Sequence, residues 1–350
     1  MALWSARVGG GGRTDERDDP GHGVTRYFLG VDGGGTNCRI RLADETSTLG
    51  EFTVREASNL QVEAGAAAAN SINKGLEQVL VQAGLRAEIL KNTYACFCMA
   101  GGRSKTARDA FASRDWPFAG VKVYDDIDAA HAGALGGEEG AVIIAGTGSA
   151  ALAIVDGVRH QCGGWGFHVG DQMSGAILGR ELLRRAYEAR EDLIPGSPLT
   201  EAALARLGGD LQEIMDWSFP IAKFVPADGS AAARGQVGVE AVILGGKTYD
   251  DFVTSRAPVD FGGFTPLIFE FFEKGDPVAR DLIDMQLGYV DNYVRWFRAR
   301  GATRLAPTGG VSERMYPLLV ERYGDFIVKP QGDNLSGAVI LARQNFAGIR

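Results

Sequence analysis

Apolar and polar positions change their spacing several times between Tyr27 and Gly102. Continuous apolar runs at 27–32 and 94–102 predict buried strands, and alternation over 38–44 predicts a half-exposed strand. Between them, 66–84 carries apolar residues at helical spacing. Strands that alternate with helices indicate an α/β fold.

A glycine-rich turn follows the first predicted strand. Cys38, Ile40 and Leu42 alternate with polar residues, so the turn leads into a second strand and closes a hairpin. A dinucleotide-binding turn would open a helix, and a P-loop would end in Gly-Lys-Ser/Thr. Glycines tolerate positive φ and let phosphate oxygens approach backbone N–H groups. The candidate phosphate-binding residues are Gly33, Gly34, Gly35, Thr36 and Asn37.

Asp32 ends the first strand, where its carboxylate is suited to hydrated Mg²⁺. This motif is weak alone, because a structural hairpin explains the glycines equally well. The segment 140–155, GAVIIAGTGSAALAIV, repeats the design and suggests an internal duplication. Its candidate ATP-binding residues are Gly146, Thr147, Gly148 and Ser149.

A third nucleotide signal lies at 304–324, where a strand, a Thr-Gly-Gly-Val turn and a helix follow one another. Gly309 and Gly310 leave room for a flat adenosine ring. Two phosphate hairpins followed by this turn resemble the actin-like ATPase superfamily of sugar kinases, chaperone ATPases and actin. The resemblance covers nearly all of 27–347. It implies two duplicated actin-like (ribonuclease H-like) α/β domains with ATP and Mg²⁺ in a central cleft.

Within this superfamily, the middle of the chain resembles one family more closely. The segment 162–183, CGGWGFHVGDQMSGAILGRELL, is similar to glucosamine and N-acetylglucosamine kinases, within the benzoyl-CoA reductase activator-type ATPase family. SNLQV (58–62), MAGGRSK (99–105) and VKPQGDNLSGA (328–338) also fit these kinases. The sugar-binding residues that the resemblance implies are Asn59, Gly102, Asp126 and Asp171, with Trp165 and Gly166 forming a wall. Core filling is the alternative for Trp165, although its glycine neighbours favour a loop.

The resemblance also places the catalytic base at Asp126, just before the second hairpin. Its carboxylate would accept the proton of the sugar 6-hydroxyl as that oxygen attacks the γ-phosphate. Asp125 and Asp128 are alternatives, and an acidic turn in solvent explains the same three residues.

Composition limits the classes of function. The net charge of −8, from 36 basic and 44 acidic residues, disfavours nucleic-acid binding. No apolar run is long enough to span a bilayer, and the cysteines lack the spacing of a zinc site, so we expect a soluble, cytoplasmic protein. Over 350 residues we expect a disordered tail (1–25), domain I (27–136 plus 337–347) and domain II (137–336). Domain II carries an insertion at about 219–263 with one predicted strand, 240–244.

The resemblance implies an ATP-dependent kinase that converts glucosamine to glucosamine 6-phosphate. N-acetylglucosamine is the alternative substrate. A less favoured alternative is an activator ATPase of 2-hydroxyacyl-CoA dehydratases or benzoyl-CoA reductases, whose cysteine loop is not evident. A sugar-responsive transcription regulator would need a DNA-binding module, for which the tail is too short. The resemblance is compatible with a homodimer.

Overall fold

The computed structural model describes residues 25–35, 37–218 and 256–348. Three predicted features lie outside the described residues. They are Thr36, almost all of the predicted tail, and the predicted insertion up to residue 255, which includes the predicted strand at 240–244. The chain divides into two compact units, the first ending at Val123 and resuming at Ala342, the second covering Tyr124–Leu341. The domain boundaries near 136 and 337 stay a prediction.

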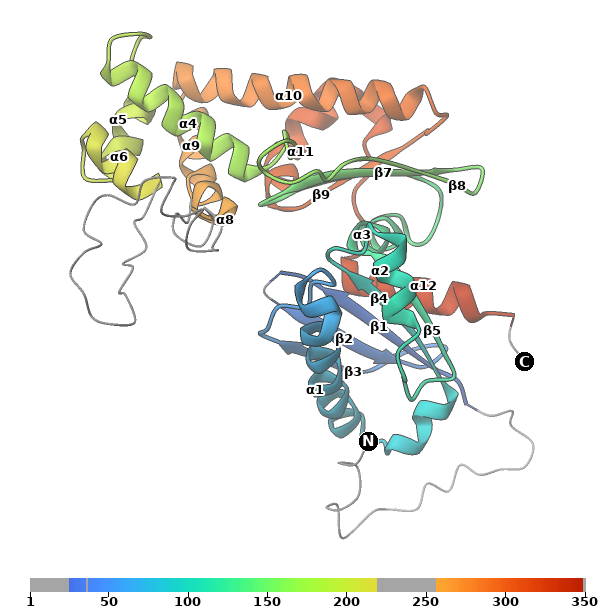
Figure 1. Cartoon of the computed structure of the whole chain (residues 1–350). Coiled ribbons are helices and arrows are strands. Elements are labelled where there is room, and N and C mark those ends of the chain that lie inside the picture. The colour runs from blue at the N-terminus through green and yellow to red at the C-terminus, as the bar shows by residue number, and fades with distance from the viewer. Residues whose placement is uncertain (1–24, 36, 219–255, 349–350) are drawn as a thin grey trace, which may run out of the picture. The chain divides into compact units, whose positions relative to one another are not determined.

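The first unit is built on a five-stranded sheet with the order β3-β2-β1-β4-β5 (Figure 1). Strand β2 runs antiparallel to both of its neighbours, β1 and β3, whereas β4 lies parallel to β1. The carboxyl ends of β1 and β4 therefore lie at the same edge of the sheet. The strands are β1 (Tyr27–Gly33), β2 (Cys38–Ala43), β3 (Thr48–Val54), β4 (Thr93–Met99) and β5 (Gly120–Asp125).

Helix α1 (Ala66–Ala83) covers one face of this sheet, against β2 and β3. It buries Ile72, Leu76 and Val79 against inward-facing strand residues such as Ile40. Each buried aliphatic side chain contributes roughly 1.5–3 kcal/mol. The first unit also contains α2 (Lys105–Ala112) and two 3₁₀ turns, Val62–Gly65 and Ala87–Asn92.

The second unit repeats the sheet pattern with four strands in the order β8-β7-β6-β9. Strands β6 and β7 form the second predicted hairpin, and β9 runs parallel to β6 as β4 does to β1. The repeated arrangement confirms the predicted duplication of an α/β unit. The strands are β6 (Gly140–Ala145), β7 (Ser149–Val155), β8 (Val158–Gly163) and β9 (Leu305–Thr308).

Helices cover both faces of the second sheet, which explains its nearly continuous apolar strands. Val142 and Leu152 pack with α3 (Asp126–Leu135), and Ala141 and Ile143 belong to the larger core on the other face. Among the described residues, no helix is long and apolar enough to cross a membrane. The other helices are α4 (Gly175–Arg190), α5 (Pro198–Ala205), α6 (Leu211–Ser218), α8 (Pro258–Gly262), α9 (Thr265–Glu273), α10 (Pro277–Arg298), α11 (Gly310–Tyr323) and α12 (Asn334–Phe346).

Candidate functional site

The first glycine loop joins β1 to β2 as the predicted hairpin. The N–H of Gly34 donates to the carbonyl of Asn37 at 2.9 Å. A Cβ on Gly33 would lie 2.4 Å from Cε of Met99, whereas a Cβ on Gly35 would meet no described residue within 4 Å. Gly33, Gly34 and Gly35 all keep φ outside the left-handed region. Steric crowding, and not backbone conformation, therefore requires the glycine at position 33.

Asp32 lies at the carboxyl end of β1, directly before this loop. Its side chain is 16% exposed, and one carboxylate oxygen lies 3.6 Å from Nη1 of Arg39. A half-buried carboxylate beside backbone that can approach phosphate suits a hydrated Mg²⁺ ion, which prefers oxygen ligands. Asp32 therefore supplies one oxygen ligand of the kind that Mg²⁺ prefers, and a magnesium ion at this position stays a prediction.

A buried serine holds the first loop in place. Ser58 donates its N–H to the carbonyl of Gly34 at 2.9 Å, and its single hydroxyl proton is shared between the carbonyls of Gly34 and Asn37, each 3.2 Å from the hydroxyl oxygen. Sequence reasoning missed this residue, because its partners lie more than 20 positions away.

The predicted sugar residues of the first unit lie beside this serine. A Cβ on Gly101, which has φ +77°, would lie 2.4 Å from Oδ1 of Asn59. The next residue, Gly102, is buried and donates its N–H to the carbonyl of Met99 at 2.9 Å. The structure thus brings Asn59 and the Gly101–Gly102 turn together near the edge of the sheet that carries the first loop.

The second glycine loop is supported by the start of α4. Gly146 donates its N–H to the carbonyl of Gly148 at 3.0 Å, and Gly175 donates its N–H to the carbonyl of Gly146 at 2.7 Å. The hydroxyl of Ser149 accepts the N–H of Met173 at 3.2 Å. These contacts fix the loop against the first residues of a 16-residue helix.

The Thr-Gly-Gly turn after β9 packs against the same loop. Gly309 has φ +90°, and a Cβ there would lie 2.6 Å from the carbonyl oxygen of Ala145. Helix α11 begins at the next residue, Gly310. The second unit therefore brings together two of the three predicted nucleotide-binding segments, 146–149 and 309–310.

Asp171 links the second loop to the loop that carries Trp165. Its carboxylate accepts the backbone N–H groups of Ser149 and Gly166, and burial, the larger effect, raises its pKa above the usual value. Its Oδ2 lies 3.0 Å from the place of a Cβ on Gly148. Trp165 is 65% exposed, so core filling is the wrong explanation for it.

The acidic turn of Asp125, Asp126 and Asp128 lies where β5 meets α3. Asp125 and Asp128 are buried, so the alternative of an acidic turn in solvent is wrong. Asp128 forms an ion pair with Arg159, and the Asp125 carboxylate accepts a hydrogen bond from the Gln161 side chain. Both alternative bases are therefore bound to residues of β8. Asp126, the first residue of α3 and half-buried, stays our predicted base.

Tyr293 of α10 is a further residue that sequence reasoning missed. A Cβ on Gly163, which has φ +72°, would lie 2.7 Å from its hydroxyl oxygen. Burial raises the pKa of Tyr293 to about 12, and the nearby Cys162 and Asp171 act in the same direction. The Tyr293 hydroxyl therefore stays protonated at neutral pH, next to Gly163, from which the chain continues to Trp165.

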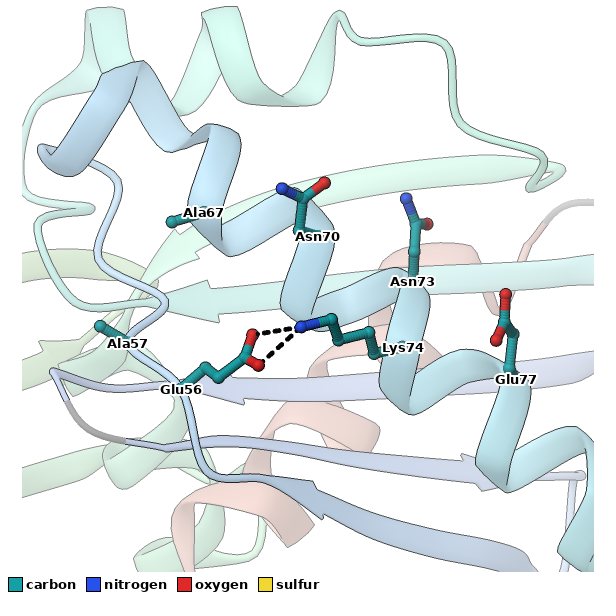
Figure 2. A pocket seen from close by; sticks show the side chains of 7 residues that line it. All are labelled: Glu56, Ala57, Ala67, Asn70, Asn73, Lys74 and Glu77. Carbon is teal, nitrogen blue, oxygen red and sulfur yellow. Dashed lines mark hydrogen bonds and ion pairs between the residues drawn. The ribbon is translucent and has the colours of Figure 1, made fainter. Parts of the chain in front are cut away.

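Two surface hollows lie away from all these residues. One, of about 470 Å³, lies on the exposed face of α1 and contains the Lys74–Glu56 ion pair at 2.6 Å (Figure 2). The other, of about 450 Å³, lies beside Pro277 at the start of α10. Neither hollow is lined by a predicted site residue. The first is lined by Glu56, Ala57, Ala67, Asn70, Asn73, Lys74 and Glu77.

Comparison with known proteins identifies the class. Residues 29–342 match the model of the BadF/BadG/BcrA/BcrD ATPase family, and the chain belongs to this family. Use of ATP follows from this membership.

Individual relatives are more specific. The chain is 29% identical over 318 residues to glucosamine kinase GspK of Vibrio cholerae, covering 90% of this chain and 95% of that one. It is 27% identical over 204 residues to an N-acetyl-D-glucosamine kinase of Dictyostelium discoideum, covering 55% and 64%. Its structure is similar to that of a candidate N-acetylglucosamine kinase of Chromobacterium violaceum, with a TM-score of 0.72, 28% identity and coverage of 91% and 99%. The predicted fold, two duplicated ATPase domains, is confirmed.

Proposed function

We propose that this protein is an amino-sugar kinase that transfers the γ-phosphoryl group of ATP to the 6-hydroxyl of glucosamine. The observation that carries the proposal is the assembly of the 146–149 loop, the Gly309 turn and Asp171 in a member of an ATPase family. The nearly full-length similarity to a glucosamine kinase favours glucosamine. N-acetylglucosamine is the second candidate, favoured by the Dictyostelium and Chromobacterium relatives.

Phosphate binding is assigned to backbone N–H groups of each glycine loop other than those of Gly34 and Gly146, which donate to carbonyls within their own loops. Such groups bind anions without a charged side chain when successive N–H groups point into one concavity. Asp32 would hold Mg²⁺ through a carboxylate oxygen, and the ion would balance charge on the phosphate oxygens. Thr36, a member of the predicted set, lies outside the described residues.

Asp126 is the proposed general base. Its carboxylate accepts the proton of the sugar 6-hydroxyl while that oxygen bonds to the γ-phosphorus, and the bond from this phosphorus to the bridging oxygen breaks to release ADP. General-base catalysis contributes typically about 10²- to 10⁴-fold in rate.

Within the second unit, sugar selectivity is assigned to Asp171, with Trp165 and Gly166 beside it. Asn59 and Gly102, in the first unit, stay predictions from the sequence resemblance. A hydroxyl without a partner leaves a buried polar group unsatisfied, which costs about 1–3 kcal/mol. The exposed Trp165 ring offers an apolar surface for the C–H face of a sugar.

A homodimer in the cytoplasm is the proposed state of the enzyme, after the sugar kinases that its sequence resembles. Light scattering coupled to gel filtration measures the assembly directly. A mass equal to one 37.2-kDa chain would contradict the dimer.

The testing experiment is coupled ADP release with Mg·ATP and either glucosamine, N-acetylglucosamine, glucose or no sugar. The position of the new phosphate is determined by NMR of the product. We expect the highest kcat/KM with glucosamine and phosphate at the 6-position. Preference for the acetylated sugar would select the second candidate, and hydrolysis independent of sugar would contradict kinase activity.

The role of Asp126 is tested with Asp126→Asn, which keeps the shape of the side chain but is a far weaker base. Sugar binding, measured by calorimetry, should persist while turnover falls by about 10²-fold or more. Asp325→Asn, at an exposed position of the same unit, is the matched control and should retain turnover. Retained turnover in Asp126→Asn would move the base to another residue.

A further inference from the structure

We propose that Arg159 and Gln161 are positioning residues that hold the acidic first turn of α3, and with it the Asp126 carboxylate, in the geometry for phosphoryl transfer. This inference rests on the proposed kinase function and on the role of Asp126 as its base. It assigns a function to two residues of strand β8 that precede the 162–183 motif.

The contacts form a closed ring of hydrogen bonds. Arg159 binds Asp128 through two nitrogens, with Nε 2.6 Å from Oδ1 and Nη2 3.1 Å from Oδ2. Its third nitrogen, Nη1, donates to Oε1 of Gln161 at 2.9 Å, and Nε2 of Gln161 donates to Oδ2 of Asp125 at 3.0 Å. The N–H of Asp125 closes the ring on Oδ2 of Asp128 at 3.2 Å. The residues on both sides of Asp126 are thereby bound to one strand.

The position of β8 explains why these two side chains reach the helix. Residues two apart on a strand point to the same face, so Arg159 and Gln161 act side by side. Strand β8 is an edge of the four-stranded sheet, and α3 packs on that sheet against β6 and β7. The strand continues at Gly163 into the loop that carries Trp165. One strand therefore supports both the turn of the base and the start of the proposed sugar-binding loop.

Charge explains why the ring contains an arginine. Three carboxylates within one helical turn repel one another, and the helix N-terminus offsets only part of this repulsion. Asp128 is 7% exposed, so its carboxylate is poorly hydrated, and the guanidinium of Arg159 supplies the balancing charge in a two-pronged contact. The Arg159 side chain is 39% exposed, so the pair is only partly buried, but removal of the arginine still leaves the poorly hydrated Asp128 carboxylate without its balancing charge.

Loss of the ring is expected to move the Asp126 carboxylate and leave ligand binding in place. A misplacement of about 1 Å can lower a rate by about 100-fold. We therefore expect Arg159→Gln to reduce kcat for sugar phosphorylation by about 10- to 100-fold, with the KM values for sugar and ATP unchanged. Arg159→Lys should recover part of kcat, because lysine restores the charge without the two-pronged contact.

A double variant separates positioning from general damage to the fold. Asp128→Asn combined with Arg159→Gln removes both charges of the pair and allows amide-to-amide hydrogen bonds, so its kcat should exceed that of Arg159→Gln alone. Arg190→Ala is the matched control, because Arg190 forms an exposed ion pair with Glu201 in the same unit, and it should keep the wild-type kcat. Thermal unfolding of each variant, with rates expressed per folded molecule, accounts for differences in stability.

Hydrogen exchange provides a readout that does not depend on activity. Arg159→Gln should increase the exchange rate of backbone amides in the first turn of α3, and Arg190→Ala should not. Wild-type kcat per folded molecule in Arg159→Gln, a changed KM with unchanged kcat, or unchanged exchange in that turn would overturn the inference. Absence of sugar-dependent ADP release from the wild-type protein would instead contradict the proposed function, and the exchange result would then decide whether β8 holds the turn.

Discussion

The two glycine hairpins follow the same plan and differ in where their carboxylates originate. Each hairpin joins two antiparallel strands, and the first strand of each has a parallel neighbour, β4 or β9. The residue before the first glycine is Asp32 in one hairpin and Ala145 in the other. In the second unit a carboxylate reaches the loop from a different segment, since Oδ2 of Asp171 lies 3.0 Å from the place of a Cβ on Gly148. The duplicated backbone has thus acquired two different chemical environments.

The glycines of the two hairpins are also required for different reasons. In the first unit, Gly33 is crowded by the side chain of Met99. In the second unit, no atom of the described ranges lies within 4 Å of a Cβ added to Gly146, and the crowded position is Gly309 on another element. Similar glycine-rich sequences therefore do not share the same sterically essential glycine.

The largest expected effect is on kcat and concerns Asp32, the carboxylate that precedes the glycines in the first hairpin only. Asp32→Asn should lower kcat by about 1,000-fold, because metal assistance contributes several kcal/mol to the transition state and each 1.36 kcal/mol is tenfold in rate. Steady-state ADP release over a range of Mg²⁺ concentrations measures this effect. Asp44→Asn, which alters a turn-capping aspartate of the same unit, should keep the wild-type rate. Equal rates for Asp32→Asn and wild type would remove Asp32 from the proposed metal site.

The steric requirement for Gly309, which packs against the second hairpin, is tested by the free energy of unfolding of glycine variants. Gly309→Ala places a side chain at φ +90° and 2.6 Å from a backbone oxygen, so we expect a loss of about 2–5 kcal/mol from backbone strain plus overpacking. Gly310→Ala is the matched control, because nothing lies within 4 Å of its added Cβ. Chemical denaturation followed by circular dichroism measures both variants. Similar stabilities for the pair would show that the turn can move away from Ala145.

The first hairpin should tolerate the same kind of change better. Gly33→Ala pushes on the end of the Met99 side chain, which is flexible but fully buried, so we expect a loss of about 1–3 kcal/mol. Gly35→Ala, where the space is open, should lie within about 0.5 kcal/mol of wild type. A larger loss for Gly33→Ala than for Gly309→Ala would reverse the comparison between the hairpins.

Sequence patterns predicted the elements of both hairpins because these depend on local spacing. The alternation at Cys38, Ile40 and Leu42 identified a strand after the first loop, and the helical spacing over 66–84 matches α1, which ends at Ala83. Each of these signals depends on residues within one element.

The supporting residues could not be predicted in the same way. Arg159 and Asp128 are 31 positions apart, and Tyr293 approaches Gly163 from a helix more than 100 residues later in the chain. Such contacts depend on how strands and helices pack, and a polar residue on an edge strand carries no local sign of its partner. Resemblance to a kinase family suggested Asp171, but its contact with Gly148 required the folded unit.

The smallest expected effect tests the carboxylate that the second hairpin takes from Asp171. Burial raises the pKa of Asp171 above its ordinary value of 3.8 in the folded protein. Between pH 3.8 and the higher folded pKa, the folded state keeps a proton that the unfolded state has released. Stability therefore falls as pH rises through this window, and the loss persists at pH 7.

Asp171→Asn removes this ionisation and keeps an oxygen that can accept the N–H groups of Ser149 and Gly166. Asparagine also tolerates the left-handed φ of +58° at this position. We expect a slightly higher unfolding temperature than wild type at pH 7, a difference that vanishes below pH 3.8, and a higher KM for the sugar. A lower unfolding temperature at pH 7 would mean that the two hydrogen bonds to the ionised carboxylate outweigh its burial. In that case Asp171 would stabilise the second loop as well as contact the sugar, and the two hairpins would differ in what holds them together as well as in their chemistry.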